Sequence, residues 1–229
     1  MVKCCFRKKS VGQEQFFVAD LCINSRQVEA EGQLASLAFT FLTTQPYISY
    51  AALEKGELVV RTTSQHLLSF LEILKNAPQY RFEQLMDICG VDYPQRVERF
   101  DVVYNLLSVT YNRRIRVIVT TDEVTPVPSV CRLWSCATWW ERECYDLFGV
   151  LFSGQPDLRR ILTDTGFEGH PLRKDFPLTG YEEVRYDMGH RRVVKEPVSL
   201  TQDFRDFDFV SPWESVLTLP GDEKAHKVL

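Results

Sequence analysis

The feature that most constrains the fold is a pair of strand-like runs separated by a three-residue polar turn that contains asparagine. Residues 100–110 (FDVVYNLLSVT) and 114–120 (RIRVIVT) are rich in the β-branched and aromatic side chains that favour strands. In the second run Ile115, Val117 and Val119 face one way while two arginines face the other. Strict alternation of this kind predicts an antiparallel β-hairpin with one buried face and one wet face.

Helical patterns lie on the N-terminal side of the hairpin. Residues 57–63 (ELVVRTT) predict a short strand, after which Ser64 is expected to cap a helix that runs to about residue 76. The expected buried side of that helix consists of Leu67, Leu68, Leu71 and Leu74.

The stretch 32–53 has no charged residue and is long enough to span a bilayer. Its many Gln, Ser and Thr side chains would mostly go unpaired in hydrocarbon, so a soluble amphipathic helix is the better interpretation. The apolar stripe of that helix would be formed by Leu34, Leu37, Ala38, Phe41 and Leu42.

A second helical region, 129–148, follows two prolines, and Thr138 with Glu141 has the spacing of a capping box. Gly149 stands where a C-cap glycine belongs. Strands followed by helices predict an α+β fold, in which an antiparallel hairpin or sheet is packed by helices and followed by a long extended C-terminal tail. We divide the chain into an N-terminal extension (1–31), an α+β core domain (32–152), and a loop with an extended partner-binding tail (153–229).

The last third of the chain differs in composition. Six of the eleven prolines lie there, and its apolar residues are scattered singly among charges, as in 201–210 (TQDFRDFDFV). Such a segment cannot easily bury its own core. Its many Phe, Tyr and Trp residues are of the type enriched at interfaces, so we expect this tail to lie on a partner.

The overall composition narrows the range of functions. Lys and Arg number 27 against 31 Asp and Glu, with basic residues clustered only near the N-terminus, which argues against nucleic-acid binding. The seven cysteines have irregular spacing without a C-x-x-C pair, so we interpret them as reduced thiols in a cytosol-like or matrix compartment. The first residues (MVKCCFRKKS) lack the apolar segment of a secretory signal, and we do not expect a cleaved presequence.

Residues 139–148 (WWERECYDLF) contain the densest group of potentially reactive side chains. Glu141, Glu143 and Asp146 could form an acid/base site with Arg142 as an electrophile. The alternative is a helix with an apolar side in the core and a charged side on a neighbouring protein. We favour the alternative, because no nucleophile or ligand set accompanies the carboxylates.

Two further groups of residues are weaker candidates for a site. Cys131, Cys136 and Cys144 with His170 could be imagined around a metal, but Cys136 and Cys144 are too far apart on a continuous helix, and buried free thiols are the better interpretation. Residues 166–175 (GFEGHPLRKD) place a histidine beside acids and cations, yet they form no phosphate-binding glycine motif. We expect a tight loop held by arginine–carboxylate pairs.

Several stretches resemble one known family. They are LMDICGVDYP (85–94), ERECYDLFGVLFSGQPDLRRIL (141–162), TDTGFEGHPLRKDFPLTGYEEVRYD (163–187) and VVKEPVSLTQDFRDFDFVSPWE (193–214). Together they resemble the 30-kilodalton subunit family of respiratory complex I, also called NADH dehydrogenase subunit 9 or the C subunit of NADH-quinone oxidoreductase. Gln155, Thr165 and Glu182 depart from that pattern, and Gln155 puts in doubt any role that needs a cation at its position.

The resemblance implies a non-catalytic structural subunit in the peripheral arm of proton-pumping NADH:ubiquinone oxidoreductase. It implies no catalytic, cofactor-binding or metal-binding residue in this chain, with FMN and iron–sulfur clusters carried by other subunits. The partner would chiefly be the 49-kilodalton-type subunit, on the matrix side of the mitochondrial inner membrane or, alternatively, the cytoplasmic face of a bacterial membrane. The implied interface residues are Glu141, Arg142, Glu143, Asp146, Arg159, Arg160, His170, Arg173, Lys174 and Asp175.

Two rival hypotheses remain open. One is a related subunit of a plastid NDH complex or a membrane-bound hydrogenase, for which so long a C-terminal tail would be unexpected. The other is a stand-alone enzyme that uses the carboxylates of Glu141, Glu143 and Asp146. Turnover by the purified chain, lost in a Glu143→Gln variant, would support the enzyme.

Overall fold

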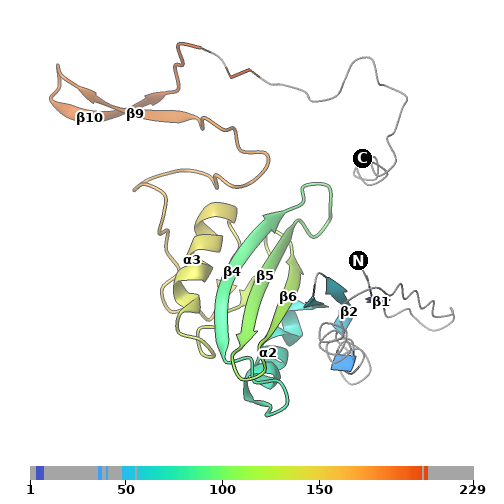
Figure 1. Ribbon diagram of the computed structural model, residues 1–229. Helices are drawn as coiled ribbons and strands as arrows, with labels where there is room; N and C mark the ends of the chain where they lie inside the picture. Colours follow the sequence, from blue (N-terminus) through green and yellow to red (C-terminus); the bar gives the residue numbers. More distant parts are fainter. Residues whose placement is uncertain are drawn as a thin grey trace, which may run out of the picture. The chain divides into compact units, whose positions relative to one another are not determined.

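The computed structural model, drawn as a ribbon in Figure 1, describes residues 4–7, 36–37, 40, 48–54, 56–202 and 204–205. Its main feature is a six-stranded mixed sheet with the order β1-β2-β3-β6-β5-β4. Only β3 and β6 run parallel, and all other neighbours are antiparallel. The strands are β1 (Cys4–Arg7), β2 (Ile48–Glu54), β3 (Glu57–Thr62), β4 (Gln84–Asp92), β5 (Phe100–Ser108) and β6 (Arg113–Thr121).

Two helices of the described part of the chain pack on one face of this sheet. A 3-10 turn, η1 (Ser64–His66), leads into α2 (Leu67–Asn76), and α3 (Ala137–Phe148) lies beside β4. The core contains Phe70, Leu71 and Leu74 of α2 together with alternate residues of the strands, such as Tyr104 and Val117. Alternation in β5 and β6 therefore places one set of side chains under the helices, as their pattern predicted.

The other face of the sheet carries a smaller apolar group. Val59, Val103 and Ile118 are buried there, with Val91 packed against them. Polar pairs surround it, including Arg116, which donates to Asn105 at 3.1 Å. This face is therefore less apolar than the face under the helices, in agreement with the predicted contrast between them.

A short parallel pair fixes the segments around α3. β7 (Val127–Pro128) precedes the helix and β8 (Phe152–Ser153) follows it, and their residues pair in register. Backbone hydrogen bonds extend the pair, from Val127 to Leu151 at 2.8 Å and from Ser129 to Ser153 at 2.9 Å. The segments that precede and follow α3 are thus hydrogen-bonded to each other.

The chain divides into two compact units, Met1–Gly180 and Tyr181–Leu229. In the second unit, β9 (Glu182–Asp187) and β10 (Arg192–Pro197) form an antiparallel hairpin. Residues 153–180 belong to the first unit. The expected boundaries at residues 31 and 152 stay a prediction.

The predicted α+β class and the central hairpin are confirmed, with β5 and β6 paired from Phe100↔Thr121 to Ser108↔Arg113. The predicted strand at 57–63 is confirmed as β3. In α2 the predicted cap is wrong, because Ser64 lies in η1 and no side chain caps either helix. The predicted burial of Leu68 is also wrong, because Phe70 takes the inward position and Leu68 is exposed.

The remaining sequence predictions concern the ends of the chain. Of the helix expected around 34–42, Ser36, Leu37 and Thr40 are helical and the other residues lie outside the described part. No helix within the described residues is long and apolar enough to cross a bilayer. Strands β1, β2, β4, β9 and β10 had not been predicted. Most of the expected tail beyond residue 202 also lies outside the described residues.

Candidate functional site

The C-terminal end of α3 is fixed by a glycine. Gly149 has φ 81°, and its amide donates to the Tyr145 carbonyl at 2.9 Å. A Cβ at this position would lie 2.5 Å from Nη2 of Arg173 and 2.7 Å from Nε2 of His170. Both the left-handed conformation and the close approach require glycine, which confirms the predicted C-cap.

The N-terminal end of α3 differs from the prediction. The helix begins at Ala137, and no side chain caps it. Instead of reaching back toward Thr138, the Glu141 carboxylate accepts hydrogen bonds from the Ser129 hydroxyl at 2.7 Å and the Val130 amide at 2.8 Å. The predicted capping box is therefore wrong, because Glu141 satisfies buried polar groups of the preceding segment.

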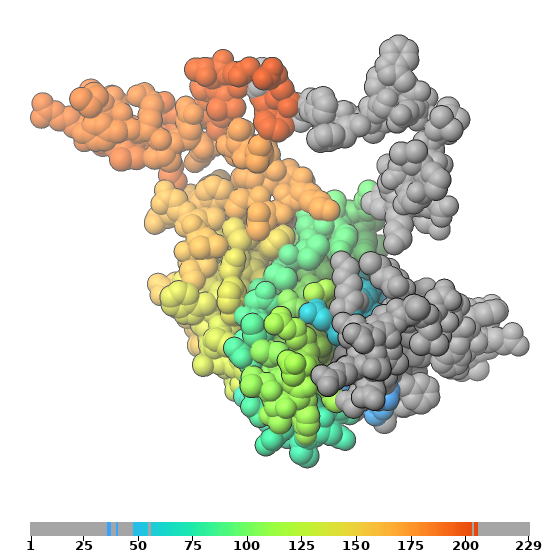
Figure 2. Space-filling model, viewed as in Figure 1, coloured from blue at the N-terminus to red at the C-terminus, as the bar shows by residue number. Residues whose placement is uncertain are grey.

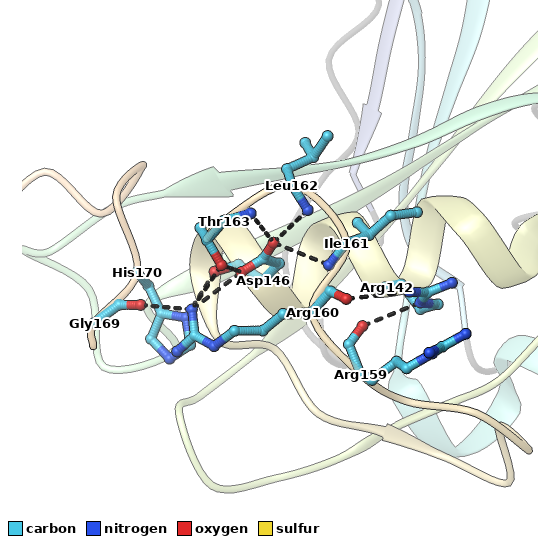
Figure 3. Close-up of polar contacts among 9 residues, drawn as sticks. All are labelled: Arg142, Asp146, Arg159, Arg160, Ile161, Leu162, Thr163, Gly169 and His170. Atoms are coloured by element: carbon cyan, nitrogen blue, oxygen red, sulfur yellow. Dashed lines mark hydrogen bonds and ion pairs between the residues drawn. The ribbon is translucent and has the colours of Figure 1, made fainter. Parts of the chain in front are cut away.

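Asp146 lies at the centre of the site, and Figure 3 shows how the neighbouring loop folds around its carboxylate. One oxygen accepts from Arg160 Nη1 at 3.0 Å and from the Thr163 hydroxyl at 2.6 Å. The other accepts from three successive backbone amides, those of residues 161–163, at 2.8 to 3.1 Å. The side chain of Asp146 is fully buried. Burial raises the pKa of its carboxyl, but hydrogen bonds from Thr163 and the two preceding amides outweigh burial and lower the pKa to about 2.

Arg142 holds the same loop from the previous turn of α3. Its guanidinium donates to the carbonyls of Arg159 and Arg160, both at 3.1 Å. Arg142 therefore binds carbonyls of segment 159–163 while Asp146 binds its amides. Arg142 and Asp146, four residues apart on α3, thus hold the same loop from two successive turns of the helix.

The loop also satisfies the carbonyls at the end of α3. The last carbonyls of any helix lack partners within the helix, and a buried helix end needs them elsewhere. Three donors from residues 170–173 supply those partners here. They are His170 Nδ1 to Asp146 O at 2.9 Å, Leu172 N to Leu147 O at 3.1 Å and Arg173 Nε to Phe148 O at 2.7 Å.

His170 is a neutral donor in this arrangement. Because a backbone carbonyl can only accept, the proton of the imidazole is on Nδ1. Burial lowers the pKa of His170, the Asp146 carbonyl raises it, and the cations of Arg173 and Arg160 lower it further. The ring therefore serves as a structural cap at neutral pH.

A second polar network ties the loop to the sheet. Arg99 forms a bidentate pair with the buried Asp92, at 2.7 and 2.9 Å, and also contacts Glu123 and Asp175 at 2.9 and 3.0 Å. The amide of Lys174 donates to Asp92 at 2.8 Å. The paired guanidinium of Arg99 lowers the pKa of Asp92 despite burial. The expected loop held by arginine–carboxylate pairs is confirmed.

Glu141 forms a separate buried cluster at the other end of α3. Besides its bonds to Ser129 and Val130, it lies 3.3 Å from the Cys131 sulfur. Burial raises the pKa of Glu141, and its three hydrogen bonds lower it in part. The Tyr104 hydroxyl is fully buried and has no hydrogen-bond partner among the described residues.

These contacts limit the chemistry that the carboxylates can perform. Glu141 and Asp146 are both 0% exposed, and their oxygens already accept bonds from this chain. No substrate reaches either one in this conformation. Glu143 is partly exposed and has no hydrogen-bond or ion-pair partner within the described part of the chain. A paired acid/base arrangement of the three is therefore not assembled here.

The cysteines considered as metal ligands are free thiols. Cys144 is buried, Cys131 is partly buried, and Cys136 and Cys89 are exposed. Burial raises the pKa of Cys144, so its thiol is protonated at neutral pH. Across the described ranges, no group of three or more His, Cys, Asp and Glu side chains is arranged to hold a metal ion.

The structure brings the ten expected interface residues together on α3 and the loop that follows. Glu141 and Asp146 face inward, whereas Arg159, Lys174 and Asp175 are exposed. Whether any of them contacts a partner stays a prediction.

Sequence reasoning missed three residues of this region. Asp92 and Arg99 join the loop to the sheet, and Trp139 is 68% exposed on α3. Asp92 and Arg99 stand seven residues apart, and because β4 was not predicted, no sequence pattern pointed to their pairing. No pattern distinguished the exposed Trp139 from the partly buried Trp140 beside it.

Comparison with known proteins gives consistent results. A family model described as the respiratory-chain NADH dehydrogenase 30-kilodalton subunit matches residues 60–182. The C subunit of the NADH-quinone oxidoreductase of Methylobacterium radiotolerans is 60% identical over 180 residues, covering 78% of this chain and 84% of that protein. The corresponding protein of Paramagnetospirillum magneticum is 61% identical over 171 residues, covering 75% and 86%.

A solved structure of the membrane-bound sulfane sulfur reductase, an archaeal respiratory membrane complex, contains a chain with a similar fold. Its TM-score is 0.54 at 26% identity, and the match covers 65% of this chain and 86% of that chain. The two oxidoreductase relatives come from bacteria, so the comparisons do not support the mitochondrial location expected above. The family match, the extent of the matches to these two relatives and the shared fold agree, and the chain belongs to the family of the 30-kilodalton subunit of respiratory-chain NADH dehydrogenase.

Proposed function

We propose that this chain is a non-catalytic structural subunit of the peripheral arm of a proton-pumping NADH:quinone oxidoreductase. In this role it supports electron transfer from NADH to quinone by holding its neighbours in place. FMN and iron–sulfur clusters would be carried by other subunits, and the main partner would be the 49-kilodalton-type subunit. Because the relatives compared are bacterial, we propose the cytoplasmic face of a bacterial membrane as the location, reached only through the complex.

The observation that carries the proposal is the orientation of α3. Its carboxylates Glu141 and Asp146 point into the chain, while the indole of Trp139 points to solvent. An enzyme site would need the opposite arrangement, with acids accessible to substrate. Exposed tryptophan is costly in water and is strongly enriched among the residues that anchor protein interfaces.

The loop after α3 supports the same interpretation. Residues 159–175 are held by side chains of α3 and by Arg99, so their backbone is fixed before any partner binds. Leu162 and Leu172 of this loop are exposed. A rigid surface with exposed apolar residues loses little conformational entropy on association, which favours tight binding.

The test is to express the tagged chain in cells that make the oxidoreductase. The amount of the oxidoreductase's other subunits that co-purifies with the tagged chain is then measured. Trp139→Ala should reduce co-purification roughly 30-fold, the loss expected of an interface anchor, without lowering thermal stability. Val97→Ala, at a side chain 98% exposed in a turn, is the matched control and should behave as wild type. Normal assembly of Trp139→Ala would contradict this use of α3.

The rival proposals predict other results. A stand-alone enzyme would turn over a substrate as the purified chain and lose that turnover in Glu143→Gln. The structural similarity to an archaeal respiratory complex is consistent with a related role in another membrane complex. Identity of 60% to NADH-quinone oxidoreductase subunits, against 26% to that chain, favours the NADH-linked complex.

A further inference from the structure

The hairpin of the second unit has two chemically different faces. Residues that lie directly opposite each other in an antiparallel pair project from the same face. Tyr186 pairs with Val193 and Val184 with Lys195, so these four side chains share one face. We call this the apolar hairpin face; it ends with the Glu182–Pro197 pair.

The opposite face is polar and is closed by its own ion pairs. Arg185 donates two hydrogen bonds to the Glu196 carboxylate, at 2.6 and 2.7 Å. Near the turn, the Asp187 carboxylate pairs with His190. Val194 also lies on this face, directly across from Arg185, and is half-buried. Arg185, Glu196 and Asp187 therefore already have partners of opposite charge within the hairpin.

The apolar hairpin face, by contrast, is open to solvent along its whole length. Val184, Tyr186 and Val193 are 54%, 55% and 64% exposed. None of the described residues of the second unit is buried, and Figure 2 shows the atoms of the hairpin in orange. A two-stranded hairpin is marginally stable in water and needs a further layer on its hydrophobic face.

We infer that the apolar hairpin face docks on an uncharged, apolar patch of another protein subunit of the same oxidoreductase. The inference rests on the proposed function, because membership of the complex supplies the partner. Charge complementarity defines the chemistry of the partner's patch. The apolar hairpin face carries one carboxylate, Glu182, and one ammonium, Lys195, so it has no net charge and fits a patch without net charge. An anionic membrane would require a net positive face, which this one lacks.

The first test measures cysteine accessibility on the two faces in full-length chains. Val184→Cys reports on the apolar hairpin face, and Val194→Cys, on the other face of the same hairpin, is the control. Alkylation rates are followed by mass spectrometry of the peptides that contain each cysteine, in the free chain and in the purified complex. Assembly should slow alkylation at Val184→Cys by about tenfold or more and leave Val194→Cys within about threefold.

Equal alkylation of Val184→Cys in the free and assembled states would overturn the inference, as would equal protection of both faces. If the chain fails to co-purify with the oxidoreductase at all, the proposed function itself fails. If it co-purifies and the apolar hairpin face stays accessible, only the present inference fails.

A second test replaces valine with aspartate on each face. Val184→Asp should weaken incorporation into the complex roughly 30-fold, because a carboxylate would be buried against an apolar patch. Val194→Asp should incorporate normally, because the new carboxylate lies opposite Arg185. Equal incorporation of the two variants would overturn the inference. So would wild-type binding to anionic phospholipid vesicles that Val184→Asp abolishes, which would assign the face to a membrane.

Discussion

Replacing Asp146 with asparagine keeps the shape of the side chain and removes its charge. One carboxylate oxygen accepts from Arg160 and Thr163, and the other accepts from three backbone amides. The asparagine side chain has only one accepting oxygen, so it can accept from only one of these two sets of donors. Its NH₂ group, which is itself a donor, must then face the donors of the other set. Each lost hydrogen bond to a charged group contributes about 1.5–3 kcal/mol, and we expect the variant to be destabilised by about 2–4 kcal/mol at pH 7.

The pKa of Asp146 gives a second magnitude for the stability contributed by the same hydrogen bonds. A folded pKa of about 2, against an ordinary value of 3.8, corresponds to about 2.4 kcal/mol of stability. Because the folded pKa is the lower one, this contribution is complete above the unfolded pKa, near pH 4, and is lost as pH falls toward 2. The stability difference between wild type and Asp146→Asn should therefore shrink over that range. Burial raises the pKa of Glu141 and gives a pH dependence of opposite sign, but both chains share it.

Urea unfolding followed by circular dichroism, at several pH values from 7 to 2, measures both the loss of stability in Asp146→Asn and its dependence on pH. Hydrogen exchange at the amides of residues 161–163 adds a local reading and should accelerate in the variant. Asp157→Asn is the control, since Asp157 is exposed and pairs with the exposed Arg159, so its effect should stay below about 1 kcal/mol. If Asp146→Asn were as stable as the control variant, or its deficit did not depend on pH, the account of this site would be refuted.

Three further changes test other parts of the structure by thermal and urea unfolding. Gly149→Ala should destabilise by about 2–4 kcal/mol because its methyl group meets loop 170–173, whereas Gly154→Ala, with φ +83° and open space around it, should lose only about 1 kcal/mol. Similar losses at the two glycines would contradict the close contact. Tyr104→Phe should change stability by less than about 1 kcal/mol, because the hydroxyl has no hydrogen-bond partner within the described residues; a larger loss would reveal a partner. Arg99→Lys should lose about 2–3 kcal/mol, because an ammonium cannot reproduce the bidentate pair, and a neutral result would count against the network.

The parts of the fold that local patterns specify were predictable. Strict alternation in β6 placed Ile115, Val117 and Val119 in the core, and Gly149 marked the end of α3. Strands β2 and β4 were missed because neither alternates cleanly. β2 lies within an uncharged stretch that resembled a helix, and β4 is interrupted by Gly90, which packs against Phe148.

The predictions for the site failed where long-range contacts decide the role of a charged residue. Glu141 has the spacing of a capping-box residue, yet its carboxylate accepts hydrogen bonds from Ser129 and Val130, several residues before the helix. Asp146 was expected on the charged side of the helix that contacts a neighbouring protein, yet it is buried because residues 160–163 supply five donors to it. Nothing in helical periodicity indicates that a loop further along the chain will fold back in this way.

The central claim is that this chain supports the complex without taking part in its chemistry. The direct measurement is NADH–quinone activity per assembled complex, with assembly quantified on native gels, for wild type, Trp139→Ala and Glu143→Gln. The account predicts that activity falls only in proportion to the amount of assembled complex, so that activity per complex stays within about twofold of wild type. A complex assembled at the wild-type level whose activity falls tenfold or more in Glu143→Gln would contradict it.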